Sequence, residues 1–377
     1  MIYLDNAATS FPKPEETIEH LTRFVTTVGG NPGRSGHKLS VEAARVIFEA
    51  REKLAKFIHG KRSERLIFTA NGTESLNLAI LGLLDENDHV ITTSLEHNSV
   101  MRPLMHLKER HGVEYTVIQC GPDGCLDIEA LARAMRKNTK AVIINHGSNV
   151  IGTTQPLREI KQAIGNVTLI TDACQTIGSV PIDIDRDNID VLCFSCHKSL
   201  LGIQGLGAIY IREGINPRPL KLGGTGSRSE SIEHPDFLPD RYECGTPNTP
   251  AIASLLGGLT FIEKQGLGRI AARKNALREK LVQGLSGIEH AIVYGCRTNE
   301  TNAPVISFNL KNKLPSEVGY ELNQREIYVR VGLTCAPMAH KTIGTFPAGT
   351  VRVSPGYFTT DAEIDHFLEE LQHIAER

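Results

Sequence analysis

A serine, a histidine and a lysine follow one apolar run of the sequence within a few residues. The run covers residues 189–193 and leads into Phe194-Ser195-Cys196-His197-Lys198, after which a glycine-rich turn begins. In open α/β sheets, ligands bind outside the carboxyl ends of the strands. A lysine held there away from water has a lowered pKa, and its free amine can form a Schiff base. Because most lysines are solvated, this segment alone fits an ordinary surface lysine better than a functional one.

Polar residues after other apolar runs could complete a binding site. Gly72-Thr73 lies at a predicted helix start, where free backbone N–H groups and the helix dipole favour a phosphate, although an ordinary helix cap is the alternative. Asp172 could pair with a protonated ring nitrogen, cap a helix or be solvated, and Gln175 could donate to a phenolic oxygen. His97 could be a core histidine, a general base or a ring that stacks on another ring.

Taken together, these residues could supply everything that one particular cofactor requires. They offer a phosphate cradle, to which Ser195 and His197 could add donors, a carboxylate for a ring nitrogen, an oxygen donor, a stacking ring and a Schiff-base lysine. This combination describes pyridoxal phosphate held at the end of an α/β sheet. The sequence therefore predicts this cofactor.

The elements that would position these residues alternate along the first part of the chain. Apolar runs at 66–68, 89–93, 141–145, 167–171 and 189–193 each precede a polar loop, and helical patterns follow at 75–84, 100–110 and from Pro156 to 164. This pattern predicts an α/β fold with a mostly parallel sheet flanked by helices, whose strand ends converge on one crevice. Ser40 is predicted to cap an amphipathic helix that runs to about Ile58, with an apolar side formed by Val41, Ala44, Ile47, Phe48, Leu54, Phe57 and Ile58.

The pattern changes after residue 212. A loop-rich stretch reaches residue 250, a helix-rich segment covers 252–285, and strands at 305–308, 327–331 and 351–354 alternate with helices near 316–323 and 360–375. This segregated layout is typical of a separate α+β unit. We therefore predict an N-terminal segment, 1–20, that packs with the small domain, a large cofactor-binding domain, 21–250, and a small α+β domain, 251–377.

The composition excludes several classes of protein. The chain has 377 residues, 40% hydrophobic and 22% charged, with a formal net charge of −2, so nothing attracts it to nucleic acid or an anionic membrane. No apolar run approaches the ~18 residues of a membrane span. The first residues lack the features of a signal peptide, so we expect a cytoplasmic location. Eight cysteines without a ligand-loop arrangement indicate neither a metal site nor a disulfide framework, and most should be small buried hydrophobes.

Seven segments of the chain resemble the class V aminotransferase superfamily, and more narrowly its cysteine desulfurase and selenocysteine lyase branch. They are Leu4-Asp5-Asn6-Ala7-Ala8-Thr9, Gly72-Thr73-Glu74, Glu96-His97, Ser148-Asn149-Val150-Ile151-Gly152, Asp172-Ala173-Cys174-Gln175, Ser195-Cys196-His197-Lys198 and Gly245-Thr246-Pro247-Asn248-Thr249. The matches run from residue 4 to about 357. The resemblance implies a pyridoxal-phosphate enzyme of fold type I, a homodimer with its active sites at the subunit interface.

The resemblance also implies a role for individual residues. Lys198 would carry the cofactor, and Asp172 would pair with its ring nitrogen. The residues implied around the rest of the cofactor are Gln175 at the ring oxygen, His97 stacked on the ring with a part in catalysis, Gly72, Thr73, Ser195 and His197 at the phosphate, and Thr246 from the partner subunit. Asn149 would lie near the ring oxygen and the substrate, with Ala8 beside the substrate. Arg352 would bind the substrate carboxylate, which suits a bidentate guanidinium.

Cys335 corresponds to the persulfide-forming cysteine of the desulfurases. It lies in Arg330-Val331-Gly332-Leu333-Thr334-Cys335-Ala336-Pro337, where the glycine permits a tight loop. A loop cysteine in a polar setting is where a thiolate nucleophile is placed, and an inert buried cysteine is the alternative. This chain differs from the family in having Thr334 where histidine is usual, and in having Cys174 and Cys196 where glycine or alanine is more frequent.

The reaction implied is conversion of L-cysteine to L-alanine. Lys198 would remove the Cα proton, and the Cys335 thiolate would take the sulfur as a persulfide and pass it to an acceptor protein. A selenocysteine lyase would use the same residues. A cystine or C–S lyase, or an aminotransferase, would have no need of Cys335. A non-catalytic scaffold for a sulfur carrier is the last alternative, and the presence of Lys198, Asp172 and Arg352 argues against it.

Overall fold

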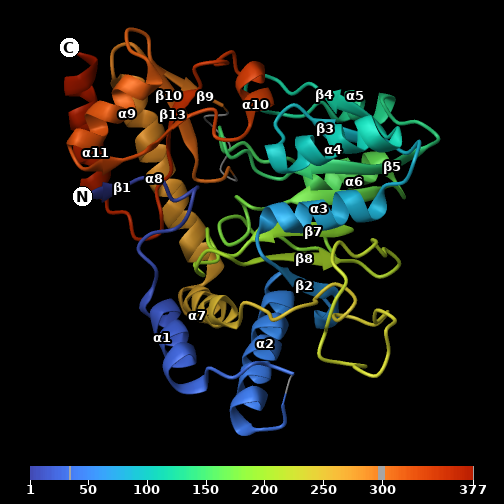
Figure 1. Ribbon diagram of the computed structural model, residues 1–377. Helices are drawn as coiled ribbons and strands as arrows, with labels where there is room; N and C mark the ends of the chain where they lie inside the picture. Colours follow the sequence, from blue (N-terminus) through green and yellow to red (C-terminus); the bar gives the residue numbers. More distant parts are fainter. Residues whose placement is uncertain (34, 296–301, 377) are drawn as a thin grey trace.

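The computed structural model describes residues 1–33, 35–295 and 302–376, and a mostly parallel sheet forms the centre of its larger part (Figure 1). Within these residues the sheet has seven strands in the order β2-β8-β7-β6-β5-β3-β4. Their bounds are β2 Leu66–Thr69, β3 His89–Thr93, β4 Glu114–Ile118, β5 Thr139–Asn145, β6 Thr168–Asp172, β7 Val191–Ser195 and β8 Gly207–Ile211. Only β8 runs against its neighbours β2 and β7, which confirms the fold class predicted from the sequence.

Helices cover both faces of this sheet, which explains why its inner strands are apolar on both sides. On one face α3 (Gly72–Leu83) and α4 (Asn98–His111) share a core with Val90, Ile143 and Val191. On the other face α2 (Lys38–Phe57), α5 (Ile128–Arg133), α6 (Leu157–Ile164) and α7 (Thr249–Gln265) share a core with Leu192 and Phe194. Between these layers, β5, β6 and β7 all end at the same edge.

The start and the buried side of α2 differ from the prediction. The helix is capped by His37, whose Nδ1 accepts from the Ser40 N–H at 3.2 Å, whereas the Ser40 hydroxyl donates to the backbone oxygen of Asn31 at 2.7 Å. Ser40 is therefore not the cap. Of the predicted apolar side, Val41 and Phe48 are 50% and 62% exposed, whereas Leu54 is buried against the core together with Ala50.

The C-terminal part forms a smaller antiparallel sheet in the order β12-β13-β10-β9. Its strands are β9 (Ala291–Tyr294), β10 (Ile306–Leu310), β12 (Arg330–Gly332) and β13 (Thr350–Val353), and it is accompanied by α8 (Leu267–Gly287), α9 (Pro315–Gln324), α10 (Pro337–Thr342) and α11 (Asp361–Ala375). The single strand predicted at 327–331 is two strands. Its first half, β11 (Ile327–Tyr328), pairs with β1 (Ile2–Tyr3), and its second half pairs with β13.

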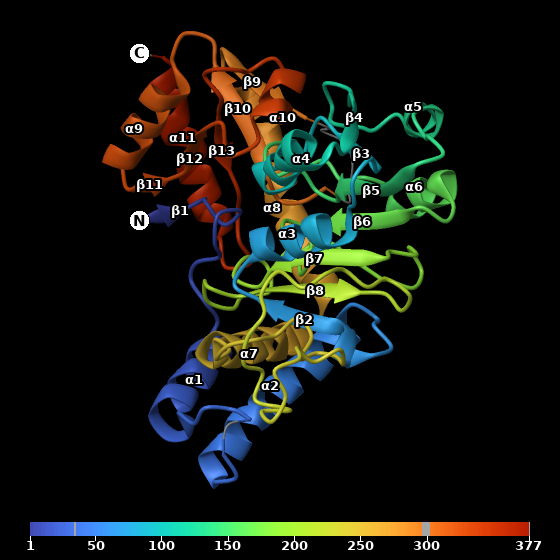
Figure 2. The same ribbon diagram turned by 45° about the vertical axis from the view of Figure 1, so that its right-hand side comes forward.

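The hydrophobic core changes along α8. Side chains of α7 such as Ile252 and Leu255 belong to the core of the large sheet, whereas Leu277 and Leu281 of α8 belong to the core of the small one. The boundary predicted near residue 250 thus falls at the start of α7, before this change. The N-terminal strand lies beside the C-terminal elements in both views (Figures 1 and 2), while α1 (Glu15–Arg23), the π-helical turn Phe24–Val28 and the 3₁₀ turn Ser63–Arg65 belong to the larger part. No helix among the described residues has the length and apolarity to cross a bilayer.

Candidate active site

The strand ends of the large sheet, the N-terminal segment, and β12, β13 and the turn after β12 in the C-terminal part enclose a cavity of about 300 Å³. This volume suits a small cofactor or substrate. The predicted site residues that line it are Ala8, Gly72, Thr73, His97, Asn149, Asp172, Gln175, Ser195, His197, Lys198, Cys335 and Arg352. Thr246 does not line it and is exposed. The structure thus brings together residues that are up to 344 positions apart in the sequence.

Lys198 follows the end of β7 and its side chain faces the cavity. Burial lowers the pKa of its amine, and the nearby Cys174 and Asp172 act in the opposite direction. A lowered pKa leaves more of the amine in the neutral form, which is the form that attacks a carbonyl group. The amine is therefore suited to holding an aldehyde.

Asp172 is the last residue of β6 and only 5% exposed. One of its carboxylate oxygens accepts from the Cys174 N–H at 2.9 Å, which fixes the orientation of the group. A buried carboxylate without an ion pair among the described residues would be costly in an isolated protein. A protonated ring nitrogen is the kind of partner that this position fits.

The amino end of α3 and the end of β7 form an anion cradle. Asn71 caps the helix by accepting from the Glu74 N–H at 2.9 Å. The N–H groups of Gly72 and Thr73, in the first turn, have no partner within the helix, and both residues line the cavity. A side chain at Gly72 would collide with Cys174 and Ser195. Glycine at this position therefore lets the start of α3 pack directly against these two residues of the cradle.

A chain of hydroxyl contacts links His97 to this cradle. The Ser99 N–H donates to His97 Nδ1 at 3.1 Å, the Ser99 hydroxyl lies 2.9 Å from the same nitrogen, and it lies 2.8 Å from the Thr73 hydroxyl. Burial lowers the pKa of His97. Because Nδ1 accepts a hydrogen bond, the neutral ring carries its proton on Nε2. Sequence reasoning missed Ser99, and its position at the start of α4, two residues after His97, was the available signal.

Cys335 is exposed, and its thiol lies at the rim of the cavity. Thr334 and Cys335 have φ values of 44° and 58°, a left-handed conformation that is uncommon outside glycine. Two hydrogen bonds hold this turn, one from Asn149 Nδ2 to the Thr334 oxygen at 2.8 Å and one from the Asn98 N–H to the Cys335 oxygen at 2.9 Å. The surroundings thus keep the cysteine in a strained backbone conformation that presents it to the cavity.

Thr334 stands directly before Cys335, and a histidine from elsewhere in the chain, His340, lies beside it. The Thr334 hydroxyl lies 3.5 Å from Nε2 of the buried His340 in α10, and His340 Nδ1 lies 2.7 Å from the Thr345 hydroxyl. Burial lowers the pKa of His340 to about 4. The ring is therefore neutral near pH 7 and supports the turn through hydrogen bonds rather than charge.

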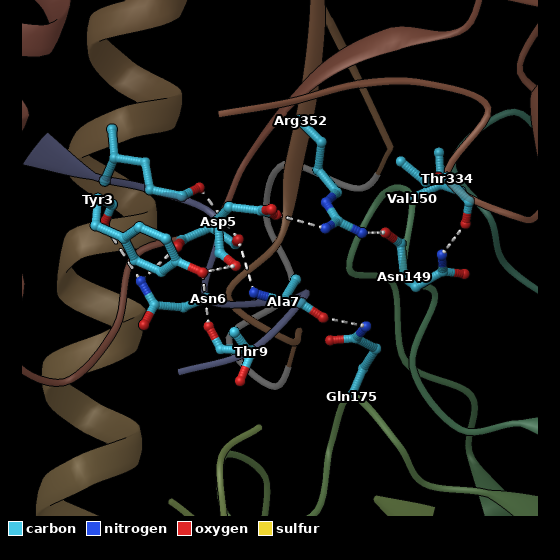
Figure 3. A network of polar contacts seen from close by, with 12 residues as sticks. Tyr3, Asp5, Asn6, Ala7, Thr9, Asn149, Val150, Gln175, Thr334 and Arg352 are labelled. Atoms are coloured by element: carbon cyan, nitrogen blue, oxygen red, sulfur yellow. Dashed lines mark hydrogen bonds and ion pairs between the residues drawn. The ribbon is translucent and has the colours of Figure 1, made fainter. Parts of the chain in front are cut away.

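Arg352 and Asn149 both line the cavity, and each has one buried polar atom outside the contacts drawn in Figure 3. Arg352 is 4% exposed; its Nη2 donates to Asp5 Oδ1 at 2.8 Å and its Nη1 donates to the Asn149 oxygen at 2.9 Å. The remaining atoms, Arg352 Nε and Asn149 Oδ1, are buried without a hydrogen-bond partner in the described structure. Because buried polar atoms are rarely left unpaired, Arg352 Nε is suited to donate to a bound carboxylate and Asn149 Oδ1 is suited to accept from a ligand donor.

Fewer of the described cysteines are buried than the sequence predicted. Cys120, Cys193 and Cys196 are buried, whereas Cys174 and Cys244 are partly exposed and Cys125 is exposed in a turn. The expectation that most are buried is therefore wrong for the described residues; Cys296 lies outside them. Burial raises the pKa of the Cys174 thiol, and the Ser195 hydroxyl donates to its sulfur at 3.5 Å, so this cysteine lies in the cradle as a neutral thiol.

Gln175 is engaged on its own side of the cavity. Its Nε2 donates to the backbone oxygen of Ala7 at 3.1 Å (Figure 3). The donation to a ring oxygen that the sequence suggests remains a prediction.

Comparison with known proteins places this cavity in a family. The sequence model of the aminotransferase class-V family matches residues 2–367. This chain belongs to the class-V aminotransferase family. The resemblance inferred from the sequence motifs is thereby confirmed.

Its relatives in the class-V aminotransferase family include cysteine desulfurases that match along nearly their whole length. A probable cysteine desulfurase of Pyrococcus abyssi is 33% identical, over 99% of this chain and 94% of that protein. A cysteine desulfurase of Escherichia coli O157:H7 is 30% identical, over 99% and 93%. The apo structure of the cysteine desulfurase from Thermococcus onnurineus NA1 superposes with a TM-score of 0.92 at 31% identity, over 100% of this chain and 94% of that one.

Proposed function

We propose that this protein is a pyridoxal-phosphate-dependent cysteine desulfurase. It converts L-cysteine to L-alanine, holds the sulfur as a persulfide on Cys335 and passes it to an acceptor protein. The observation that carries the proposal is the exposed Cys335 on a strained turn at the rim of the cavity that also contains Lys198. A plain aminotransferase has no use for a thiol held in this way.

The cavity fits the proposed cofactor in three respects. The buried Asp172 suits a protonated pyridine nitrogen, the amino end of α3 with Thr73, Ser195 and His197 suits a phosphate, and Lys198 suits an aldehyde. When bound, pyridoxal phosphate supplies an electron sink that stabilises a negative charge on the substrate Cα.

The protein's own residues then divide the remaining work. Arg352 binds the substrate carboxylate, Lys198 takes the proton from Cα, and the Cys335 thiolate attacks the substrate sulfur. In that last step a sulfur–sulfur bond forms and the carbon–sulfur bond of the substrate breaks. His97, neutral and with its proton on Nε2, is a ring that can stack on the cofactor and donate that proton.

We also propose a cytoplasmic homodimer in which Thr246 serves the partner's site. Thr246 is exposed and lies outside its own cavity, which agrees with a role across an interface. The composition offers no feature that would direct the protein to nucleic acid or membrane.

Replacement of Cys335 by alanine tests the proposal. We expect Cys335→Ala to lose sulfide release from L-cysteine in the presence of a thiol reductant, while the visible absorbance of the lysine-bound cofactor remains. Cys125→Ala, which removes another exposed thiol outside the cavity, is the matched control and should retain activity. Unchanged sulfide release by Cys335→Ala would instead identify a cystine or C–S lyase. A comparison of turnover with L-cysteine and L-selenocysteine separates a desulfurase from a selenocysteine lyase.

A further inference from the structure

The N-terminal segment lies along the small domain and reaches the cavity. The Leu4 N–H donates to the Tyr328 oxygen at 2.9 Å, the Ser354 N–H donates to the Leu4 oxygen at 2.7 Å, and the Asn6 N–H donates to the Ser354 oxygen at 3.1 Å. The Ala7 N–H donates to the Ser354 hydroxyl at 2.9 Å. The backbone on both sides of Asp5 is therefore fixed, and its carboxylate is held in one place.

Asp5 is the only carboxylate paired with Arg352 among the described residues. Oδ1 of Asp5 lies 2.8 Å from Nη2, and the exposed fractions of the two side chains are 17% and 4%. The opposite nitrogen, Nη1, donates to the Asn149 oxygen. These two contacts fix the plane of the guanidinium (Figure 3), and they leave Nε as its unpaired buried donor.

A substrate carboxylate at Arg352 would be the second anion on one cation. An arginine this deeply buried is costly without a counter-ion, and Asp5 supplies that counter-ion before any substrate binds. The same negative charge opposes a second carboxylate nearby, because unit charges interact appreciably over several ångströms in a partly buried site. The strength of substrate binding then depends on this balance.

We propose that Asp5 is a specificity-determining residue that weakens and orients carboxylate binding at Arg352. This inference rests on the proposed function, in which Arg352 binds the carboxylate of an amino acid. Asp5 holds the guanidinium in one orientation and neutralises it between turnovers. Release of the product amino acid is thereby favoured, because Asp5 still balances the charge of Arg352 when the product carboxylate leaves.

The test is the affinity of the cofactor-loaded enzyme for L-alanine, followed through the change in cofactor absorbance. Asp5→Asn keeps an oxygen that can accept from Nη2 and removes the charge. We expect its Kd for L-alanine to fall on the order of tenfold. The Kd for L-alaninol, which has no carboxylate, should stay within about twofold, a result that a general structural change would not give.

Three further variants keep the test decisive. Asp5→Ser is a second neutral variant with the same expected direction if Asp5→Asn does not load cofactor. Asp5→Glu keeps the charge and should not bind L-alanine more tightly than wild type. Asp361→Asn removes the carboxylate of an exposed ion pair with Arg273, 2.7 Å long and outside the cavity, and should change neither Kd.

The inference is overturned if the neutral variants bind L-alanine no more tightly than wild type, or if Asp5→Glu tightens binding as much as they do. Because no sulfur chemistry is involved, this result is independent of whether Cys335 forms a persulfide.

Discussion

Lys274 is a buried lysine whose replacement has a calculable effect on stability. It lies in α8 and is 5% exposed, and its amine donates to the hydroxyls of Ser179 and Ser199 at 2.9 and 3.0 Å. No carboxylate pairs with it among the described residues. Burial lowers the pKa of its amine from 10.5 to about 7. The sequence did not indicate a role for Lys274, although one of its partners, Ser199, directly follows Lys198.

The sign and size of the effect follow from this pKa. Between pH 7 and pH 10.5 the folded amine is mostly neutral while the unfolded one is protonated, so the unfolded state binds about one more proton. Stability therefore rises with pH across this window. From pH 7 to pH 9 the gain is about 2 kcal/mol, at ~1.4 kcal/mol per pH unit for one proton, because the folded amine is still half protonated at pH 7. For a chain of 377 residues, this corresponds to about 3 °C in Tm.

Lys274→Met removes this dependence, and thermal unfolding at several pH values measures it. The Tm of the variant minus that of wild type should fall by about 3 °C between pH 7 and pH 9. The two lost hydrogen bonds contribute equally at every pH and drop out of this difference. Lys161→Met is the matched control, because Lys161 has a carboxylate partner, Asp190, at 2.6 Å; that variant should be less stable at every pH. A Tm difference for Lys274→Met that does not change with pH would refute the reasoning.

Two further predictions concern residues beside the cavity. Burial raises the pKa of Glu96 to about 8, so between about pH 4.5 and pH 8 the folded state binds more protons than the unfolded state and loses stability as the pH rises. The Tm of Glu96→Gln minus that of wild type should therefore increase from pH 5 to pH 8. A difference that does not change with pH would contradict this. Asn149→Ala removes the hydrogen bond to the Thr334 oxygen, so persulfide formation in a single turnover should slow by about tenfold while the cofactor absorbance remains. The control is Asn98→Ala, which leaves the backbone contact to Cys335 in place and should form the persulfide at a rate near that of wild type.

The apolar runs of the sequence were enough to predict the strand ends that build the site. β5, β6 and β7 are buried on both faces, so their sequences are continuously apolar and the polar residues after them stand out. β4, which lies at the sheet edge and starts with an exposed glutamate, gives no such signal and was missed. The start of α2 was misplaced because His37 is an uncommon cap, and Ser40 offered a more usual one.

Contacts between distant segments could not be read from the sequence. The motifs indicated that Asp172, Lys198 and Cys335 act together, but nothing local shows that Asn149 holds the Thr334 carbonyl or that Asp5 pairs with Arg352. Both contacts depend on how the small sheet docks on the large one. Propensity and periodicity describe single elements, whereas these bonds arise from tertiary packing.

Mass spectrometry of Cys335 tests the central claim most directly. The cofactor-loaded enzyme is treated with L-cysteine without reductant, alkylated and digested, and the peptide that contains Cys335 is measured against the peptide that contains Cys125. We expect one added sulfur atom on Cys335, lost when a thiol reductant or a sulfur-acceptor protein is added, and none on Cys125. Formation of L-alanine from L-cysteine with no added sulfur on Cys335 would contradict it.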